Sequence, residues 1–213
     1  MIEVVTPDIA FLYRDKLDAM FALRHRVFHE RLGWDVNSRG GRERDVYDLH
    51  NPVYLLATDE HGTVHGTWRL LPTTGPYMLR DVFGDVFADI DKPADPFVWE
   101  ISRFAVEPGP AGEDRRGALN RLTSELFVGL VEWALLFGIR EVVTVHDIRV
   151  ARLLNHLGVQ PKWSSDPHRI GETVAVAGRF EVSDEVLENI RAATGVTDSV
   201  LAAQRAKEVL DAA

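Results

Sequence analysis

The segment from Phe97 to Val106 constrains the fold most, because it is apolar, aromatic and β-branched apart from Glu100 and Arg103. Such a run predicts a buried central strand. An unpaired buried charge is costly, so each of the two needs a partner or a chemical use. A structural ion pair explains this strand as well as a functional role does. Residues three apart on a regular strand face opposite sides, so we expect a β-bulge or local splay that turns one of them.

The composition is typical of a globular protein, with 213 residues, 46% hydrophobic and 27% charged. This length predicts a single main domain at residues 1–182 and a C-terminal helical extension at residues 183–213. The net charge of −9 argues against general nucleic-acid binding. With no cysteine, no disulfide, thiol nucleophile or thiolate metal site is possible, and we expect no metal. Neither a secretory signal nor a membrane-length apolar run is present, so we expect a cytoplasmic enzyme that does not bind membranes.

The apolar periodicity predicts an α/β protein built on a mixed sheet. Residues 52–58 and 63–71 flank a turn-rich stretch and predict an antiparallel hairpin. Further strands are predicted at residues 2–5, 97–106, 141–146, 159–163 and 172–180. Helices are predicted at residues 11–29, up to 137 after the central strand, 148–157, and from 183 onward with a break near Gly195, with a short helix or turn at 77–87.

Two arginines lie in apolar surroundings. Arg24 repeats at the helical period with Leu17, Phe21 and Phe28, so it points inward. Arginine stays protonated in proteins, and an inward guanidinium therefore demands a carboxylate or a bound anion. The alternative for Arg24 is a side chain that reaches solvent at the rim. Arg69 is likewise a charge within an apolar strand.

The polar stretch at residues 31–50 is too long for an ordinary connection, and it predicts a mobile lid at residues 31–47. It contains Trp34, which is costly to leave in water. Asp45 and Asp48 are close enough in sequence for both carboxylates to contact a single cation. The alternative for both acids is simple solvation of the loop.

Six strings in this order resemble the acyl-homoserine lactone synthases of bacterial quorum sensing. The resemblance covers residues 2–180, and the strings are residues 23–28, 33–34, 45–48, 68–71, 73–79 and 99–104. Every charged position of the family's signature is filled, and the aromatic positions are Phe28 and Trp34. The charged positions are Arg24, Asp45, Asp48, Arg69, Glu100 and Arg103.

The resemblance implies a three-layer sandwich like that of the N-acetyltransferases, with a twisted central sheet and helices on both faces. It also implies an acyltransferase of autoinducer synthesis. The amine of S-adenosylmethionine attacks an acyl thioester on acyl carrier protein or coenzyme A, and the methionyl carboxylate then closes the lactone and expels methylthioadenosine. S-adenosylmethionine is thus a substrate, and no cofactor is expected.

The resemblance and the residue types together suggest roles. Glu100 is the candidate base for the amine, directly or through a water. Arg24, Arg69 and Arg103 steer the carboxylate or pair with the acids. Four aromatic residues enclose the adenosyl and sulfonium groups, with core packing as the alternative, which is favoured for Phe83. These residues are Phe28, Trp34, Phe83 and Phe104.

Two further features of the sequence bear on the acyl chain and its carrier. Thr144 is the one side-chain hydroxyl in an apolar run, and it matches a position at which family members that prefer 3-oxo chains carry threonine. The resemblance therefore implies a 3-oxo or otherwise 3-substituted acyl chain, because the hydroxyl can donate to a 3-oxo group. Its alternative is a hydrogen bond to its own backbone or a neighbour. The exposed face of the helix at 148–157 predicts a docking surface for the acidic carrier protein, with a solvated face as the alternative. This face consists of Arg149, Arg152 and His156.

Two rival functions remain. A plain N-acetyltransferase binds the pyrophosphate of acetyl-CoA on backbone N–H groups after the central strand. The corresponding residues 107–117 carry glycines, but also prolines that remove donors and acids that repel phosphate. This weakens acetyl-CoA and acyl-CoA alike without excluding acyl-CoA. The other rival is a binding module without turnover, which loss of Glu100 or of an arginine would favour, and none is lost.

Overall fold

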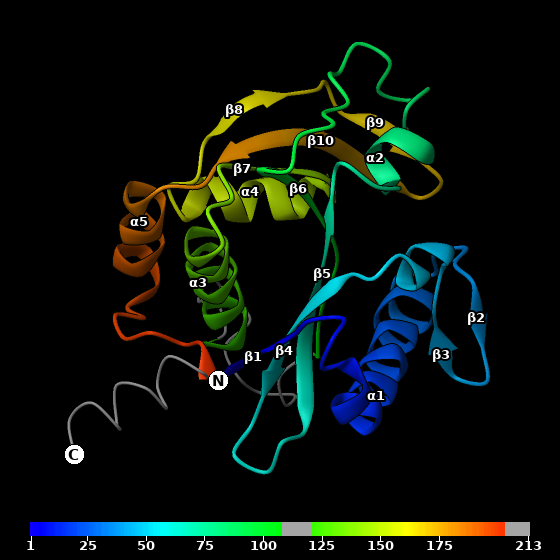
Figure 1. Cartoon of the computed structure of the whole chain (residues 1–213). Helices are drawn as coiled ribbons and strands as arrows, with labels where there is room; N and C mark the ends of the chain where they lie inside the picture. The colour runs from blue at the N-terminus through cyan, green and yellow to red at the C-terminus, as the bar shows by residue number, and fades with distance from the viewer. Residues whose placement is uncertain (108–120, 203–213) are drawn as a thin grey trace.

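The computed structural model describes residues 1–107 and 121–202. Its centre is a large twisted sheet with helices on both faces (Figure 1). Along the sheet the strands follow the order β1-β4-β5-β6-β7-β10-β8, with β9 beside β10. Only the β6–β7 contact is parallel among these described strands. The mixed sheet expected from the sequence is confirmed. The strands are β1 Ile2–Val5, β4 Val53–Thr58, β5 Val64–Pro72, β6 Val98–Val106, β7 Glu141–Asp147, β8 Pro161–Ser164, β9 His168–Ile170 and β10 Thr173–Glu181.

The helices agree with the sequence except near the N-terminus. The expected single helix at residues 11–29 divides into a 3₁₀ turn, an α-helix and a π-helical segment that continues to Arg31. A change from α to π spacing leaves no composition signal, and such segments are frequent at functional sites. The long polar stretch also contains regular structure that the sequence did not predict, a small hairpin and a 3₁₀ turn. The helical elements are η1 Ala10–Tyr13, α1 Arg14–Arg24, η2 His25–Arg31, η3 Val46–Leu49, α2 Met78–Asp81, α3 Arg121–Leu136, α4 Ile148–His156 and α5 Asp184–Thr194, and the small hairpin is β2 Ser38–Arg39 with β3 Arg42–Glu43.

Side chains that alternate along β4 belong to different cores on the two faces of the sheet. Leu55 belongs to the core under α3 and α5, whereas Tyr54 and Leu56 belong to the core under α1 and η2. A third core lies below α2 and includes Val98 and Val143. Side chains that alternate in this way bury both faces of the strand, which explains why β4 is continuously apolar.

The predicted irregularity in β6 is present. The register between β5 and β6 shifts between Thr67 and Arg69, and Arg103 adopts a left-handed backbone with φ of 56°. A non-glycine residue in this region is uncommon and costs about 1–3 kcal/mol. On the other side, β6 pairs with β7 only from Val98 to Glu100. The central strand is therefore bulged on one side and unpaired with β7 beyond Glu100.

The segment after β10 packs against the main core. Ser183 caps α5, and Gly195 ends it with φ of 72°, which confirms the predicted break. Leu187 and Leu201 are buried in the core under α3. The domain boundary proposed at residue 182 stays a prediction. Within residues 1–107 and 121–202, no helix is long and apolar enough to cross a membrane.

Candidate active site

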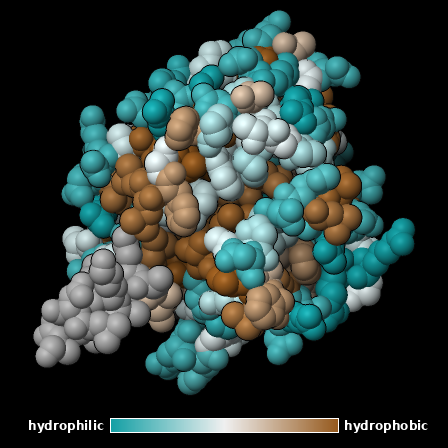
Figure 2. Space-filling view, viewed as in Figure 1, coloured by the Kyte–Doolittle hydropathy of each residue, from teal (hydrophilic) through white to brown (hydrophobic). Residues whose placement is uncertain are grey.

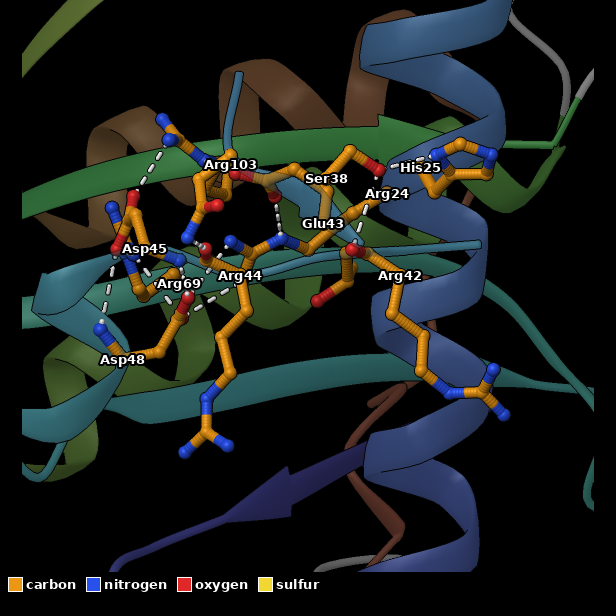
Figure 3. Close-up of polar contacts among 12 residues, drawn as sticks. Arg24, His25, Ser38, Arg42, Glu43, Arg44, Asp45, Asp48, Arg69 and Arg103 are labelled. Atoms are coloured by element: carbon orange, nitrogen blue, oxygen red, sulfur yellow. Dashed lines mark hydrogen bonds and ion pairs between the residues drawn. The ribbon is translucent and has the colours of Figure 1, made fainter. Parts of the chain in front are cut away.

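A buried ion-pair network joins α1, the small hairpin and two central strands (Figure 3). Nε of Arg24 lies 2.5 Å from Oε2 of Glu43, and its Nη1 lies 2.8 Å from Oδ1 of Asp48. The side chains of these three residues are fully buried. Burial alone lowers the pKa of Arg24, but the Asp48 and Glu43 carboxylates more than offset this and raise it. The inward position predicted for Arg24 is confirmed, and Asp48 and Glu43 supply the carboxylates that it demands.

Two further arginines complete the network. Nη1 of Arg69 lies 2.5 Å from Asp45 and 3.1 Å from Asp48. Arg103 reaches Glu43 at 3.1 Å and Asp45 at 2.6 Å. Three cations thus face three carboxylates, and the network is formally neutral. Burial raises the pKa of Asp48, but the adjacent arginines lower it well below its usual range.

The loop acids hold their own backbone as well. Oδ1 of Asp45 accepts from the N–H groups of Tyr47 at 2.9 Å and Asp48 at 3.3 Å, and Oδ2 of Asp48 accepts from the Asp45 N–H at 2.8 Å. This reciprocal capping box fixes η3 beside the network. The cation that both acids address is the guanidinium of Arg69. Simple solvation of the loop is therefore not their role.

Glu100 stands apart from these ion pairs. Its side chain makes no ion pair with an arginine among the described residues, so the alternative of a structural pair with Arg103 is wrong. Its carboxylate accepts from the backbone N–H groups of Met78 at 3.0 Å and Leu79 at 2.6 Å. Burial raises the pKa of Glu100 to about 7, although the two N–H groups and nearby arginines act in the opposite direction. A carboxyl with this pKa can exchange a proton near neutrality.

The sulfur of Met78 receives two cationic donors. Nη2 of Arg69 lies 3.0 Å from it and Nη1 of Arg103 lies 3.3 Å from it. A thioether is a weak acceptor, so these guanidinium N–H groups are poorly satisfied compared with those that face carboxylates. The two arginines therefore present N–H groups that an anion would bind better.

A cavity of about 1000 Å³ lies beside this cluster and is lined from both faces of the sheet. Figure 2 shows apolar side chains gathered across the middle of this side of the molecule. Asp45, Glu100 and Arg103 reach the cavity wall, whereas Arg24, Asp48 and Arg69 lie behind it. All four predicted aromatic residues line the cavity, as does Thr144.

The aromatic residues form two groups. Phe28 and Trp34 stack with centroids 5.3 Å apart and planes 4° apart. The Arg103 guanidinium lies 5.7 Å from the Phe28 centroid. Trp34 donates from Nε1 to Oγ1 of Thr173 at 2.8 Å, which joins the predicted lid to β10. Phe104 and Phe83 also pack against core clusters, so for them core packing and cavity lining coincide.

The residues predicted to address the acyl donor lie farther along the chain. Thr144 is 4% exposed, and its hydroxyl makes no hydrogen bond within the described residues, so the alternative of a backbone bond is wrong. Arg149, Arg152 and His156 are exposed on α4. Nη2 of Arg149 pairs with the Asp147 carboxylate at 2.7 Å, which offsets part of the positive charge of this face. The turn at residues 107–117 lies outside the described residues beyond Glu107.

Sequence reasoning missed three members of the site: Glu43, Tyr54 and Met78. Glu43 lies in a polar loop between Arg42 and Arg44, where nothing distinguishes it from a solvated acid. The Tyr54 hydroxyl donates to Oδ1 of Asp48 at 2.7 Å, and burial raises the pKa of this tyrosine. Met78 lies within one of the strings quoted above, and only its contacts reveal its position.

Several solved structures have a similar fold. The chain is similar to the CoA-dependent acyl-homoserine lactone synthase BjaI with SAM and isopentyl-CoA (TM-score 0.80, 30% identity, 94% of this chain and 92% of that one). It is also similar to the AHL synthase LasI (TM-score 0.77, 32% identity, 93% and 98% coverage). An N-acetyltransferase from Lactobacillus plantarum shares the fold at a TM-score of 0.56 and 17% identity, covering 85% of this chain and 99% of that one. The N-acetyltransferase-like architecture is confirmed.

Sequence comparisons match most of the chain to the same class of synthases. The autoinducer synthase family model matches residues 8–190. An acyl-homoserine-lactone synthase of Agrobacterium fabrum is 38% identical over 186 residues, which are 87% of this chain and 88% of the relative. The corresponding enzyme of Aliivibrio fischeri strain ES114 is 38% identical over 168 residues, 78% of this chain and 86% of the relative. With its ion-pair network, buried Glu100 and through-sheet cavity in place, the chain belongs to the autoinducer synthase family, the acyl-homoserine-lactone synthases.

Proposed function

We propose that this enzyme joins the amine of S-adenosylmethionine to the acyl group of a thioester and closes the product to an N-acyl-homoserine lactone, releasing methylthioadenosine. The observation that carries the proposal is Glu100, a carboxyl with a pKa of about 7 in the wall of the cavity. Relatives with this reaction in their names support it, as does a relative's structure with SAM and isopentyl-CoA.

Glu100 is the proposed general base. The ammonium of S-adenosylmethionine gives one proton to the carboxylate, and the free amine attacks the thioester carbonyl. The new C–N bond forms, the C–S bond breaks, and a proton ends on the departing thiol. The N–H groups of Met78 and Leu79 hold the carboxylate in one orientation, so it reaches the amine without reorganising.

Arg69 and Arg103 are the proposed site for the methionyl carboxylate. Both direct an N–H group at the sulfur of Met78, a weak acceptor that a carboxylate would displace. Arg24 lies behind the cavity wall, as Arg69 does, but its Nε, Nη1 and Nη2 all bond Glu43 or Asp48 and none is directed at Met78. We therefore assign Arg24 the role of holding these two acids. The three arginines thus have two different proposed roles, which the sequence alone did not distinguish.

Lactone closure depends on how the protein positions the methionyl chain. The carboxylate oxygen attacks the carbon next to the sulfonium, and the C–S bond breaks to release methylthioadenosine, so the protein needs to bend the methionyl chain and needs no second base. We assign the adenosyl and sulfonium groups to the stacked pair Phe28 and Trp34. A cation over an aromatic face gains about 0.5–2 kcal/mol.

Acyl carrier protein is the donor we propose, with acyl-CoA as the alternative. The exposed cations of α4 lie close to the cavity, since Arg149 lines it. The CoA-dependent relatives favour the alternative.

The test is an assay of purified enzyme with S-adenosylmethionine and acyl thioesters on each carrier. We expect the lactone, methylthioadenosine and free thiol to appear in equal amounts. Release of thiol without methylthioadenosine would contradict the proposed second step. No product from any donor would overturn the proposed function.

A further inference from the structure

Two polar side chains of β7 line the cavity, and the steps proposed above use neither. Thr144 and His146 are two residues apart, so they share one face of the strand. Both line the cavity of about 1000 Å³. Across the ladder they lie opposite Gly178 and Val176 of β10. The wall around them is apolar and includes Leu130, Val131, Val142, Leu154 and Phe180.

The imidazole of His146 is packed against one aromatic ring. Its centroid lies 5.9 Å from that of Phe180, with 53° between the planes. Gly178 permits this arrangement, because a Cβ there would lie 2.7 Å from Cε2 of Phe180 and 3.5 Å from Cε1 of His146. The glycine therefore leaves the space in which Phe180 packs beside the imidazole.

Both polar groups lack a protein partner. Nδ1 of His146 is buried without a hydrogen bond to any described residue, and the Thr144 hydroxyl makes none within the same part of the chain. Burial lowers the pKa of His146 to about 4, although Asp147 acts in the opposite direction. The ring is thus neutral near pH 7, with one nitrogen donating and the other accepting. Leaving such groups unpaired is unfavourable, so a ligand that supplies the partner is selected.

The register places these groups next to the reacting centre. Glu100 pairs with Val143 across β6 and β7, and Thr144 is the next residue. Paired residues share a face and the next residue points to the other side, so Thr144 and His146 lie across the sheet from Glu100. The cavity is lined from both faces. An acyl chain whose carbonyl meets the amine beside Glu100, and whose tail passes through this cavity, therefore brings its first carbons past Thr144 and towards His146. Alternate residues on a strand are about 6.6 Å apart, and hydrogen bonds of about 2.8 Å from each side meet near one atom.

We propose that His146 is a specificity-determining residue that selects, together with Thr144, acyl chains with an oxygen on the third carbon. This rests on the proposed function. The family resemblance of Thr144 already implies a 3-substituted chain, and the inference adds His146 as the second side chain that recognises the oxygen. An oxo oxygen accepts from Thr144 and from a ring N–H, whereas a hydroxyl donates to one and accepts from the other. A plain methylene leaves both side chains unpaired.

His146 has a second place in the structure that the experiment must separate. Together with Leu154, Val159 and Phe180 it also lines a neighbouring cavity of about 240 Å³. These residues are therefore a wall between two cavities. A residue acting only as this wall would limit chain length and be indifferent to oxygen.

The experiment is a competition among 3-oxo, 3-hydroxy and unsubstituted donors, compared at equal length and repeated at several chain lengths, with products measured by mass spectrometry. We expect the wild-type enzyme to prefer an oxygenated donor, and His146→Leu to reduce that preference roughly tenfold. His146→Gln keeps a donor and an acceptor and should retain most of it. Thr144→Val should reduce it as His146→Leu does.

Each other result overturns the inference. If the wild-type enzyme uses oxygenated and plain donors equally, the inference is overturned before any variant is tested. An unchanged ratio in folded His146→Leu, or a shift only towards longer chains, would leave Thr144 acting alone or His146 acting as a wall. If His146→Leu fails to fold, His146→Gln and the wild-type preference decide. An enzyme that makes no lactone from any donor fails the proposed function instead, before variants are compared.

Discussion

Arg103 shows how one backbone conformation organises the site. A regular strand would direct Glu100 and Arg103 to opposite faces. The left-handed φ of 56° at Arg103 instead brings its guanidinium to Glu43 and Asp45, and to the same methionine whose N–H holds Glu100. The strain is local, and the buried ion pairs hold it in place.

Glu100→Gln should leave the fold intact and lower the rate of acyl transfer about 10²–10⁴-fold, the usual contribution of a positioned base. The base works in its ionised form, so the wild-type rate should rise with pH through the pKa of about 7. Steady-state assays from pH 5.5 to 8.5 measure both. Glu107→Gln, which changes a half-exposed acid near Arg26, is the matched control. Wild-type rates in Glu100→Gln would remove Glu100 from catalysis.

Glu43→Gln should destabilise the protein by about 3–5 kcal/mol, because it leaves parts of two buried guanidinium groups without a charged partner. Glu43 is fully buried and contacts both Arg24 and Arg103. Urea denaturation measures the free energy of unfolding. Asp18→Asn removes an exposed pair with Arg42 and should cause no measurable change. Equal losses in the two variants would show that burial of the network does not matter.

At the scale of elements, the limited β6–β7 ladder explains the cavity. The two strands pair for three residues and not beyond Glu100, so side chains from both sheet faces line one space. Periodicity predicted both strands, the hairpin before them and the inward face of α1, because burial leaves a repeating apolar pattern. It could not predict the π-helical turn or the choice of Glu43, since neither leaves a pattern in one sequence.

The segment at residues 31–47 stays a predicted lid, and one hydrogen bond joins its Trp34 to the sheet. Thr173→Val removes this bond, so limited proteolysis should cut the segment faster than in wild type, while Thr173→Ser keeps the hydroxyl and serves as control. S-adenosylmethionine should slow cutting in all three proteins, because closure buries the segment. Cutting that is identical with and without this substrate would contradict closure.

At the scale of the whole molecule, the net charge of −9 opposes an acidic carrier at long range. Association therefore needs a local cationic surface, and on α4 the two arginines differ. Arg149 is paired with Asp147, whereas Arg152 is exposed and makes no ion pair with a described residue. Arg152 should thus contribute more to the attraction than its neighbour.

Arg152→Glu should raise the KM for acyl carrier protein substrate more than Arg149→Glu, and neither should change the KM for S-adenosylmethionine. The defect should shrink between about 0.05 and 0.5 M salt, because the Debye length falls below the separation of exposed charges. Steady-state kinetics at several salt concentrations measure this, with Lys162→Glu, on the exposed strand β8, as a charge-matched control. A carrier KM that neither variant changes, together with efficient use of acyl-CoA, would instead assign this enzyme to the coenzyme A branch of its family.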